Sequence, residues 1–400
     1  MMQDHVDSNA VRFLTLNTFL LDVNLRSRAT LALRLPLIAP EIARLNPDVI
    51  MLQEVWGRRY RRYLQQAFAQ LGWGYSAYAC PIPAACAGTK LTAGFASFAG
   101  LSAVQGARAS RRHRRAFIGT AIGSLVLTGA SAFAANTLRD YGNGLLIISR
   151  WPVRETSAMS FRVHTRWDEA LVYKGAIRAS IEAPGPAYID VVNTHLGART
   201  FDFTRGAYEP GTVRANALQL DELMAWIRAD ARSGAEGAPE ATVVAGDFNF
   251  DPWVVEDGAI TSRRNLSYGK LVDAGPEGLG LIDSFVAANG VTVGGFTGGT
   301  APRGTPPRAT ATGGDASQTS RRCQKPPERI DYIFVSQAVS VTSSQVVLNE
   351  VIRDRADKDH LRQTHGLESL PLHVSDHFGL LSTVELPSGR RLQRRGRDMC

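Results

Sequence analysis

Six short apolar runs in this chain share one property: each carries, at one end, a polar residue suited to metal or phosphate chemistry. The runs are rich in Val, Ile and Leu and are apolar on both faces, so they are predicted to form buried strands. Ligands characteristically collect at one end of a sheet that helices cover. The pattern therefore predicts a helix-covered sheet with a polar site at one end. The runs and their polar residues are VRFLTLN with Asn17, PDVIMLQE with Glu54, YIDVVNTH with His195, ATVVAGDFN with Asp247 and Asn249, RIDYIFVS with Asp331, and HVSDHFGLLSTVEL with Asp376 and His377.

Helical segments are predicted between these strands. Residues 28–46 have helical spacing of apolar side chains, and residues 58–73 follow the second strand. Residues 213–230 are amphipathic, and Leu218, Leu223 and Ile227 are expected to share the buried face. Strands that alternate with helices predict a layered α/β sandwich.

Two internal segments and the C-terminal end interrupt the pattern. Residues 80–138 form a hydrophobic and basic insertion. Residues 298–328 are rich in Gly, Pro and Thr and are predicted to be a disordered insertion, because they cannot bury enough apolar surface to offset the entropy of ordering. The basic tail 387–400 is predicted to be disordered as well. We expect a single catalytic domain over residues 11–386.

Composition narrows the class of partner and the compartment. The formal net charge of +8 favours polyanions such as nucleic acid or an anionic lipid surface, without choosing between them. The four cysteines form no C-x-x-C pair and no metal-ligand spacing with the histidines, so a disulfide framework is not expected, although a single pair of Cys80 with Cys86 stays open. The N-terminal segment carries early acidic residues and does not resemble a secretory signal, which predicts a cytoplasmic protein.

Seven short motifs bring a family resemblance. LNTF, QEVW, NGLLIISRWPV, NTHL, GDFN, RIDYI and SDHFGL occur in the order typical of the endonuclease/exonuclease/phosphatase superfamily. The resemblance runs from about residue 11 to residue 386, apart from the two insertions. It implies an α/β sandwich of two packed mixed β-sheets flanked by helices, and a metal-dependent phosphodiesterase.

The residue types suit that chemistry. Hydrolysis of a phosphodiester needs an activated water, neutralisation of the phosphoryl charge and help for the leaving group. Mg²⁺ prefers carboxylate, amide and water oxygens. Glu54 is the expected main ligand of Mg²⁺, or of Mn²⁺ or another divalent cation. Asn17 is expected to contact the metal's water or a phosphate oxygen, and the resemblance implies the same roles for both residues.

Further roles follow for the other polar residues. His377 is the expected general base, because imidazole titrates near neutral pH, and the resemblance assigns Asp331 as its carboxylate partner. His195 is expected to donate to a phosphoryl oxygen in the transition state. Asp247 and Asn249 are predicted to alternate on one strand, with Asp247 orienting the water or assisting the base and Asn249 binding phosphate. The last candidate, Asp376, either holds metal or orients the base.

The substrate class stays open between alternatives. NTHL followed by a helix, YKGAIRASI and the apolar residues after SDH resemble neutral sphingomyelinases, which implies sphingomyelin at a membrane surface as substrate. A Mg²⁺-dependent nuclease is the alternative, because it would suit the basic charge. A catalytically silent membrane adaptor on the same fold is the third interpretation. No protein partner is predicted.

The uncharged run 116–138 follows the basic cluster RRHRR and looks like a membrane-spanning helix when taken alone. A single crossing would place Glu54 on one side of the bilayer and His377 on the other, which is incompatible with a shared site. A second crossing through 91–107 would be short for a bilayer that needs roughly 20 residues. Two interpretations remain: a hydrophobic hairpin in the membrane interface, giving peripheral membrane association through 80–138, or a Gly/Ala-rich helix packed on the protein.

Overall fold

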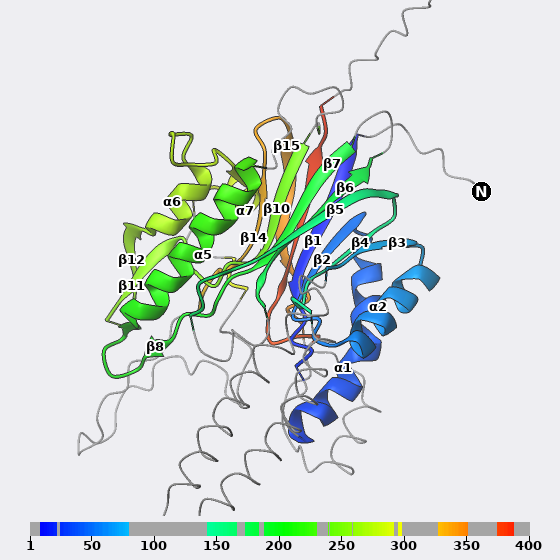
Figure 1. Ribbon diagram of the computed structural model, residues 1–400, viewed down its shortest axis with the longest axis horizontal. Coiled ribbons are helices and arrows are strands. Elements are labelled where there is room, and N and C mark those ends of the chain that lie inside the picture. Colours follow the sequence, from blue (N-terminus) through cyan, green and yellow to red (C-terminus); the bar gives the residue numbers. More distant parts are fainter. Residues whose placement is uncertain are drawn as a thin grey trace, which may run out of the picture.

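Figure 1 shows the computed structural model, in which the strands form a central body with helices on its outer sides. The structure describes the following residues: 9–21, 25–79, 142–165, 173–183, 188–229, 239, 241–257, 259–291, 295–297, 327–350 and 374–387.

The first six-stranded sheet has the strand order β15-β16-β1-β2-β4-β3. Its central strand β1 is parallel to β2 and antiparallel to β16, so the first and last long strands of the described chain are neighbours. The six strands of this sheet are β1 (Ala10–Asn17), β2 (Val49–Gln53), β3 (Tyr75–Ala77), β4 (Leu146–Ser149), β15 (Ser340–Val347) and β16 (Gly379–Glu385).

The second six-stranded sheet has the order β13-β14-β10-β7-β6-β5, with β7 parallel to β10. Its strands are β5 (Val153–Ser160), β6 (Gly175–Glu182), β7 (Tyr188–His195), β10 (Ala241–Asp247), β13 (Ile282–Asp283) and β14 (Asp331–Val335). Two small antiparallel pairs lie outside both sheets: β8 (Phe201–Asp202) with β9 (Ala207–Tyr208), and β11 (Trp253–Glu256) with β12 (Ala259–Arg264).

Side-chain alternation along the strands builds three apolar layers. One face of each sheet enters a common core, to which β1 contributes Phe13 and β10 contributes Val243. The outer face of the first sheet packs on α1 and α2, and that of the second sheet packs on α5 and α6 (Figure 1). The predicted layered α/β sandwich with two mixed sheets is confirmed. The helices are α1 (Leu25–Arg44), α2 (Arg58–Gln70), α5 (Pro210–Ala229), α6 (Leu266–Val272) and α7 (Ser284–Asn289).

The predicted buried face of α5 is partly wrong. Leu223 is buried as expected, but Leu218 is 40% exposed. The helix is instead rotated so that Asn216 and Gln219 face inward. The side-chain amide of Asn216 donates to the carbonyls of Gly197 and Phe248, and Gln219 Oε1 accepts from the Gly197 amide at 2.6 Å. These polar bonds hold the loops that leave β7 and β10, and apolar periodicity could not predict them.

The strand register of the second sheet makes the polar residues at its strand ends neighbours. Asp247 at the end of β10 is paired with His195 on one side and with Asp331 on the other. Gly246 precedes it with φ 141°, and a Cβ atom there would lie 1.9 Å from the carbonyl oxygen of Thr194. Only glycine allows β10 to approach β7 this closely at the end that carries the polar residues.

The predicted insertion 80–138, most of the insertion 298–328 and the tail after residue 387 lie outside the described residues, so the expectations about them stay predictions. The last residue assigned to the second insertion, Glu328, is described and is buried, so the predicted disorder does not extend to it. No helix among the residues that the structure describes is long and apolar enough to cross a membrane.

Candidate active site

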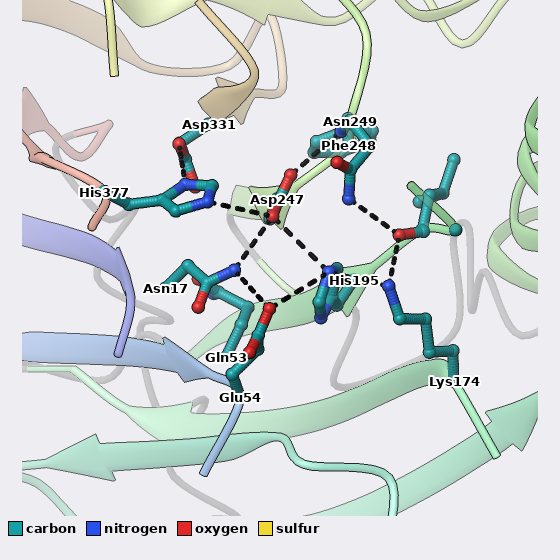
Figure 2. Close-up of polar contacts among 12 residues, drawn as sticks. Asn17, Gln53, Glu54, Lys174, His195, Asp247, Phe248, Asn249, Asp331 and His377 are labelled. Atoms are coloured by element: carbon teal, nitrogen blue, oxygen red, sulfur yellow. Dashed lines mark hydrogen bonds and ion pairs between the residues drawn. The ribbon is translucent and has the colours of Figure 1, made fainter. Parts of the chain in front are cut away.

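The polar residues predicted at the strand ends gather between the two sheets (Figure 2). Two come from parallel strands of the first sheet and two from parallel strands of the second, and the start of β14 and the loop before β16 complete the group. In that order they are Asn17 at the end of β1, Glu54 after β2, His195 at the end of β7, Asp247 at the end of β10, Asp331 at the start of β14 and His377 before β16.

Asn17 joins the two sheets. Its amide nitrogen donates to Glu54 Oε1 at 3.0 Å and to Asp247 Oδ2 at 2.9 Å. Its amide oxygen accepts from the backbone N–H of Phe19 at 3.1 Å. Asn17 therefore presents a donor to the site in this arrangement, and its amide oxygen bonds to its own loop.

Asp247 is the point on which three neighbouring side chains converge. Its Oδ2 lies 3.4 Å from Nε2 of His195 and 3.9 Å from Nε2 of His377, in addition to its bond from Asn17. Burial and the neighbouring carboxylate of Asp331 raise the pKa of Asp247 to about 7. A carboxylate held this way needs positive charge close to it to stay ionised.

His377 has the carboxylate partner that the resemblance implied. Its Nδ1 lies 2.9 Å from Oδ2 of Asp331, so the ring keeps Nε2 directed toward Asp247. Burial by itself lowers the pKa of His377, but the charge and hydrogen bond of Asp331 and the charges of Asp247 and Asp376 together outweigh burial and raise the pKa well above its usual value. The backbone N–H of Asp331 donates to Thr297 Oγ1 at 3.0 Å, which fixes the start of β14.

Asn249 lies in the site, but it does not share a strand with Asp247 as predicted. Strand β10 ends at Asp247, and Asn249 adopts a left-handed conformation with φ 55°. Its backbone N–H donates to Asp247 Oδ1 and its side-chain amide donates to the carbonyl of Leu196, both at 2.9 Å. The GDFN motif is therefore a strand end followed by a tight turn, in which side-chain bonds replace the sheet ladder.

Lys174 is a site residue that the sequence reasoning missed. Its Nζ lies 2.9 Å from Nε2 of His195 and donates to the carbonyl of Leu196 at 3.0 Å. The pKa of His195 is well below its usual value, because of burial first and then the positive charges of Lys174 and His377. The only sequence signal was its place just before β6 in YKGAI, a motif used only for the family resemblance.

The contact to Lys174 also changes the expectation for His195. An ammonium group has only donors, so Nε2 of a neutral His195 accepts from Lys174. The proton is then on Nδ1, which is buried and has no hydrogen-bond partner among the described residues. In this arrangement the donor directed at the site from β6 and β7 is Lys174, with His195 beside it.

Trp56 is a second site residue that the sequence did not indicate. It is buried, but its Nε1–H donates to Glu54 Oε2 at 3.4 Å. Glu54 itself has a left-handed backbone with φ 55°. The bonds from Asn17 and Trp56 therefore fix both oxygens of a carboxylate that projects from an unusual backbone position.

Two sets of groups among the described residues are candidates for holding a hard divalent cation. Glu54 keeps 16% of its side chain exposed, and burial followed by the nearby Asp376 raises its pKa above the usual range. Two neighbouring carboxylates repel each other unless a cation neutralises them. The second set is Asp247, Asp331 and His377, whose ligand atoms lie within 4.8 Å of one another. The first set offers only carboxylate oxygens, whereas the second set includes the imidazole of His377, so the first set is the better match to an oxygen-preferring cation.

Comparison with known proteins agrees with the fold. The profile of the Endonuclease/Exonuclease/phosphatase family matches residues 14–377. Similar solved structures include sphingomyelinase C from Streptomyces griseocarneus (TM-score 0.51, 14% identity, 94% of this chain and 99% of that chain) and truncated Caenorhabditis elegans TDP2 (0.51, 14%, 94% and 97%). A third is a beta toxin mutant from Staphylococcus aureus with bound magnesium ions (0.50, 14%, 93% and 98%). No curated protein matches the chain.

Proposed function

This chain belongs to the endonuclease/exonuclease/phosphatase family, and we propose that it hydrolyses sphingomyelin to phosphocholine and ceramide with the help of a divalent cation. The observation that carries the proposal is the convergence of carboxylates, imidazoles and an ammonium group from both sheets. Asn17, which donates to Glu54 and Asp247 at once, is the link between the two halves. A phosphodiesterase needs this combination of cation ligands, anion donors and a base in one place.

Glu54 and Asp376 are the residues that would hold Mg²⁺, or Mn²⁺ or another hard divalent cation. When bound there, the cation neutralises charge on the phosphoryl oxygens and lowers the pKa of a coordinated water. Trp56 and Asn17 support this by fixing the orientation of the Glu54 carboxylate.

Lys174 and Asn249 are the donors assigned to the phosphoryl group. Both bind the carbonyl of Leu196 in the resting arrangement, so their donor groups are close together. Donors held in place before the reaction stabilise the negative charge that grows on the phosphoryl oxygens. Nε2 of His195 accepts from Lys174, so His195 is assigned to orient that ammonium donor.

His377 is assigned as the general base, with Asp331 as its orienting partner. Its side chain is 14% exposed, whereas that of Asp247 is 1% exposed, so His377 is better placed to meet a water beside the substrate. The oxygen of that water bonds to phosphorus, and one of its protons passes to His377. The bond from phosphorus to the ceramide oxygen breaks, and that oxygen gains a proton from solvent. Asp247 compensates the charge that develops on the ring.

A lipid substrate is favoured by the motifs NTHL, YKGAIRASI and SDHFGL, which resemble those of neutral sphingomyelinases. The basic insertion 80–138 would meet the membrane surface from which the head group enters. A nuclease is the second candidate, which the net charge of +8 favours. A catalytically silent membrane adaptor is the third.

The test offers sphingomyelin vesicles and plasmid DNA in parallel to the purified protein with Mg²⁺, and measures phosphocholine release and DNA nicking. We expect phosphocholine release that EDTA abolishes and Mg²⁺ restores. Glu54→Gln should lower the rate at least about 100-fold, because it removes a charged group at the reacting centre. Glu182→Gln, at an exposed ion pair with Arg154, is the matched control and should keep the wild-type rate.

Each other outcome contradicts the proposal. DNA nicking without phosphocholine release would replace it with the nuclease. Cleavage of neither substrate, together with membrane binding that Glu54→Gln leaves unchanged, would favour the adaptor. Activity that resists EDTA would refute the role of the cation.

A further inference from the structure

The turn that carries Asn249 is held in part by a residue that has no assigned role in the reaction. A left-handed backbone is unfavourable for most residues with a side chain and is kept only where neighbours fix it. The N–H and the side-chain amide of Asn249 are held by Asp247 and Leu196, and its carbonyl oxygen accepts from Nε of Arg199 at 2.5 Å. Arg199 is therefore the contact that fixes the far side of this peptide.

Arg199 is itself held in a buried setting. Its Nη2 lies 3.5 Å from Oε1 of Glu328, and the two side chains are only 7% and 2% exposed. The guanidinium carbon lies 4.2 Å from the centre of the Tyr208 ring. The phenol of Tyr208 donates to the same oxygen of Glu328. We call Arg199, Glu328 and Tyr208 the arginine clamp.

The clamp is drawn from three separate segments. Arg199 follows the end of β7 by four residues, Tyr208 lies on β9 and Glu328 stands three residues before Asp331. Tyr208 also packs edge-to-face on Phe201 of β8, with 5.2 Å between ring centres. The small β8–β9 hairpin is thereby connected through one guanidinium to the turn of Asn249.

We infer that Arg199 is a positioning residue, which holds the Asn249 turn so that its side-chain amide stays directed at the substrate phosphoryl group. This inference rests on the proposed function, in which Asn249 contacts the phosphate. A buried ion pair adds little to stability by itself, since desolvation offsets its attraction. The Arg199–Glu328 pair lies against the backbone of Asn249, so we assign it to positioning Asn249 and not to stabilising the fold.

The geometry requires arginine. The planar guanidinium donates through Nε to one acceptor and through Nη2 to another while its face lies on an aromatic ring. The ammonium of lysine is a single point and cannot make these three contacts at once. Arg199→Lys should therefore lose as much activity as Arg199→Gln, although it keeps the charge.

The experiment measures kcat and KM for phosphodiester hydrolysis by wild type, Arg199→Gln, Asn249→Ala and the double variant. We expect Arg199→Gln to lower kcat by about 100-fold, as a misplaced catalytic group does, with KM little changed. In the Asn249→Ala background the same change should have no further effect, because Arg199 acts through Asn249. Arg205→Gln is the matched control: this exposed arginine of the same hairpin pairs only with Asp202 among the contacts of the described chain, and its loss should leave kcat unchanged.

An equal loss in the Asn249→Ala background would overturn the inference, because Arg199 would then act on the substrate or on the whole site. Amide hydrogen exchange of the peptide that contains Asn249 gives a readout independent of activity. Arg199→Gln should speed this exchange, and wild-type exchange would refute the clamp even if the protein cleaves no phosphodiester. If Arg199→Gln does not fold, Tyr208→Phe removes the phenol bond to Glu328 and keeps the ring. It should give a smaller change of the same kind, and no change in kcat or exchange would count against the clamp.

Discussion

Asp331 is completely buried, and the single hydrogen bond of its side chain in the described chain goes to the ring of His377. Its two oxygens have unequal surroundings, since Oδ2 holds the imidazole and Oδ1 has no partner. The carboxylate thus fixes the tautomer and orientation of the ring and favours its protonated form. The effect on orientation and the effect on protonation can be tested by replacing Asp331 with asparagine, which removes the charge and keeps the shape of the side chain.

Asp331→Asn should lower kcat by about 10²- to 10⁴-fold, because the amide no longer selects the productive tautomer. It should also move the pH profile. A base must be neutral, so activity is lost as pH falls through the pKa of His377. Asp331 raises that pKa, and without its charge the acidic limb of kcat/KM should shift to lower pH. Initial rates across pH measure both effects.

Asp190→Asn is the matched control for this prediction. Asp190 is also a buried aspartate of the second sheet. It lies near the start of β7, away from the site, and pairs with Arg178 of β6. Its replacement should cost stability and leave the acidic limb where it is. A limb that does not move in Asp331→Asn would show that His377 is not the titrating base.

For single residues, the sequence predicted those polar side chains that stand at the ends of apolar strands. It did not find Lys174, Trp56 or Arg199, because their residue types and places in the chain do not by themselves indicate a contact with the site. Their contacts are made across the fold: Lys174 to His195, and Arg199 to Asn249. Such residues become recognisable only when the strand register is known.

Among the elements, helix α1 does more than cover the first sheet. It carries Arg34, a buried arginine that donates to three backbone carbonyls: Thr18 at 3.1 Å, Phe19 at 2.8 Å and Val374 at 3.0 Å. The first two follow Asn17, and the third precedes the loop of Asp376 and His377. The helix therefore connects two active-site loops that are more than 350 residues apart in the sequence.

Arg34→Met should destabilise the protein by about 3 kcal/mol or more, because it leaves several buried carbonyls without a donor. Activity should fall as well, since both loops lose their common support. Arg44→Met is the control on the same helix: this arginine is 74% exposed and pairs with Glu41, so the change should stay within about 0.5 kcal/mol. Urea unfolding of both variants measures the difference, and equal midpoints would refute the bridging role.

Elements were predicted well where one face is apolar and less well where polar side chains face inward. The six strands with polar ends and the three helices before β2, after β2 and before β10 were found. Two errors came from the same cause. Leu218 was assigned to the buried face of α5, and Asn249 to the strand of Asp247, because the side-chain bonds of Asn216, Gln219 and Asn249 to loop carbonyls have no periodicity.

For the whole molecule, the two sheets form one site only because the parallel strands of each end at the same place. Gln53 and Asn193 connect the sheets in the core, with Gln53 Nε2 donating to Asn193 Oδ1 at 2.7 Å. Gln53 directly precedes Glu54, and Asn193 lies two residues before His195. A buried polar pair thus helps to fix the distance between the two halves of the site, because a satisfied polar contact rigidifies a core.

The place where the first insertion leaves the sandwich makes its function testable. A Cβ atom on Gly142 would lie 3.4 Å from the carbonyl oxygen of Ala79, so the two flanks of residues 80–141 are in contact. Strands β3 and β4 on either side are antiparallel neighbours. A short Gly/Ser linker can therefore join residues 79 and 142 without altering the register of the first sheet.

Replacing residues 80–141 by such a linker should leave hydrolysis of detergent-dispersed sphingomyelin unchanged and reduce hydrolysis of sphingomyelin in anionic vesicles, if the insertion contacts the membrane. The reduction should be greatest at low salt, where the arginines of RRHRR attract anionic lipid most strongly. Replacing those four arginines by glutamine within the full chain is the control, and should reproduce the salt-dependent part alone. Equal losses on both forms of substrate would instead indicate that the insertion packs on the protein and supports the fold.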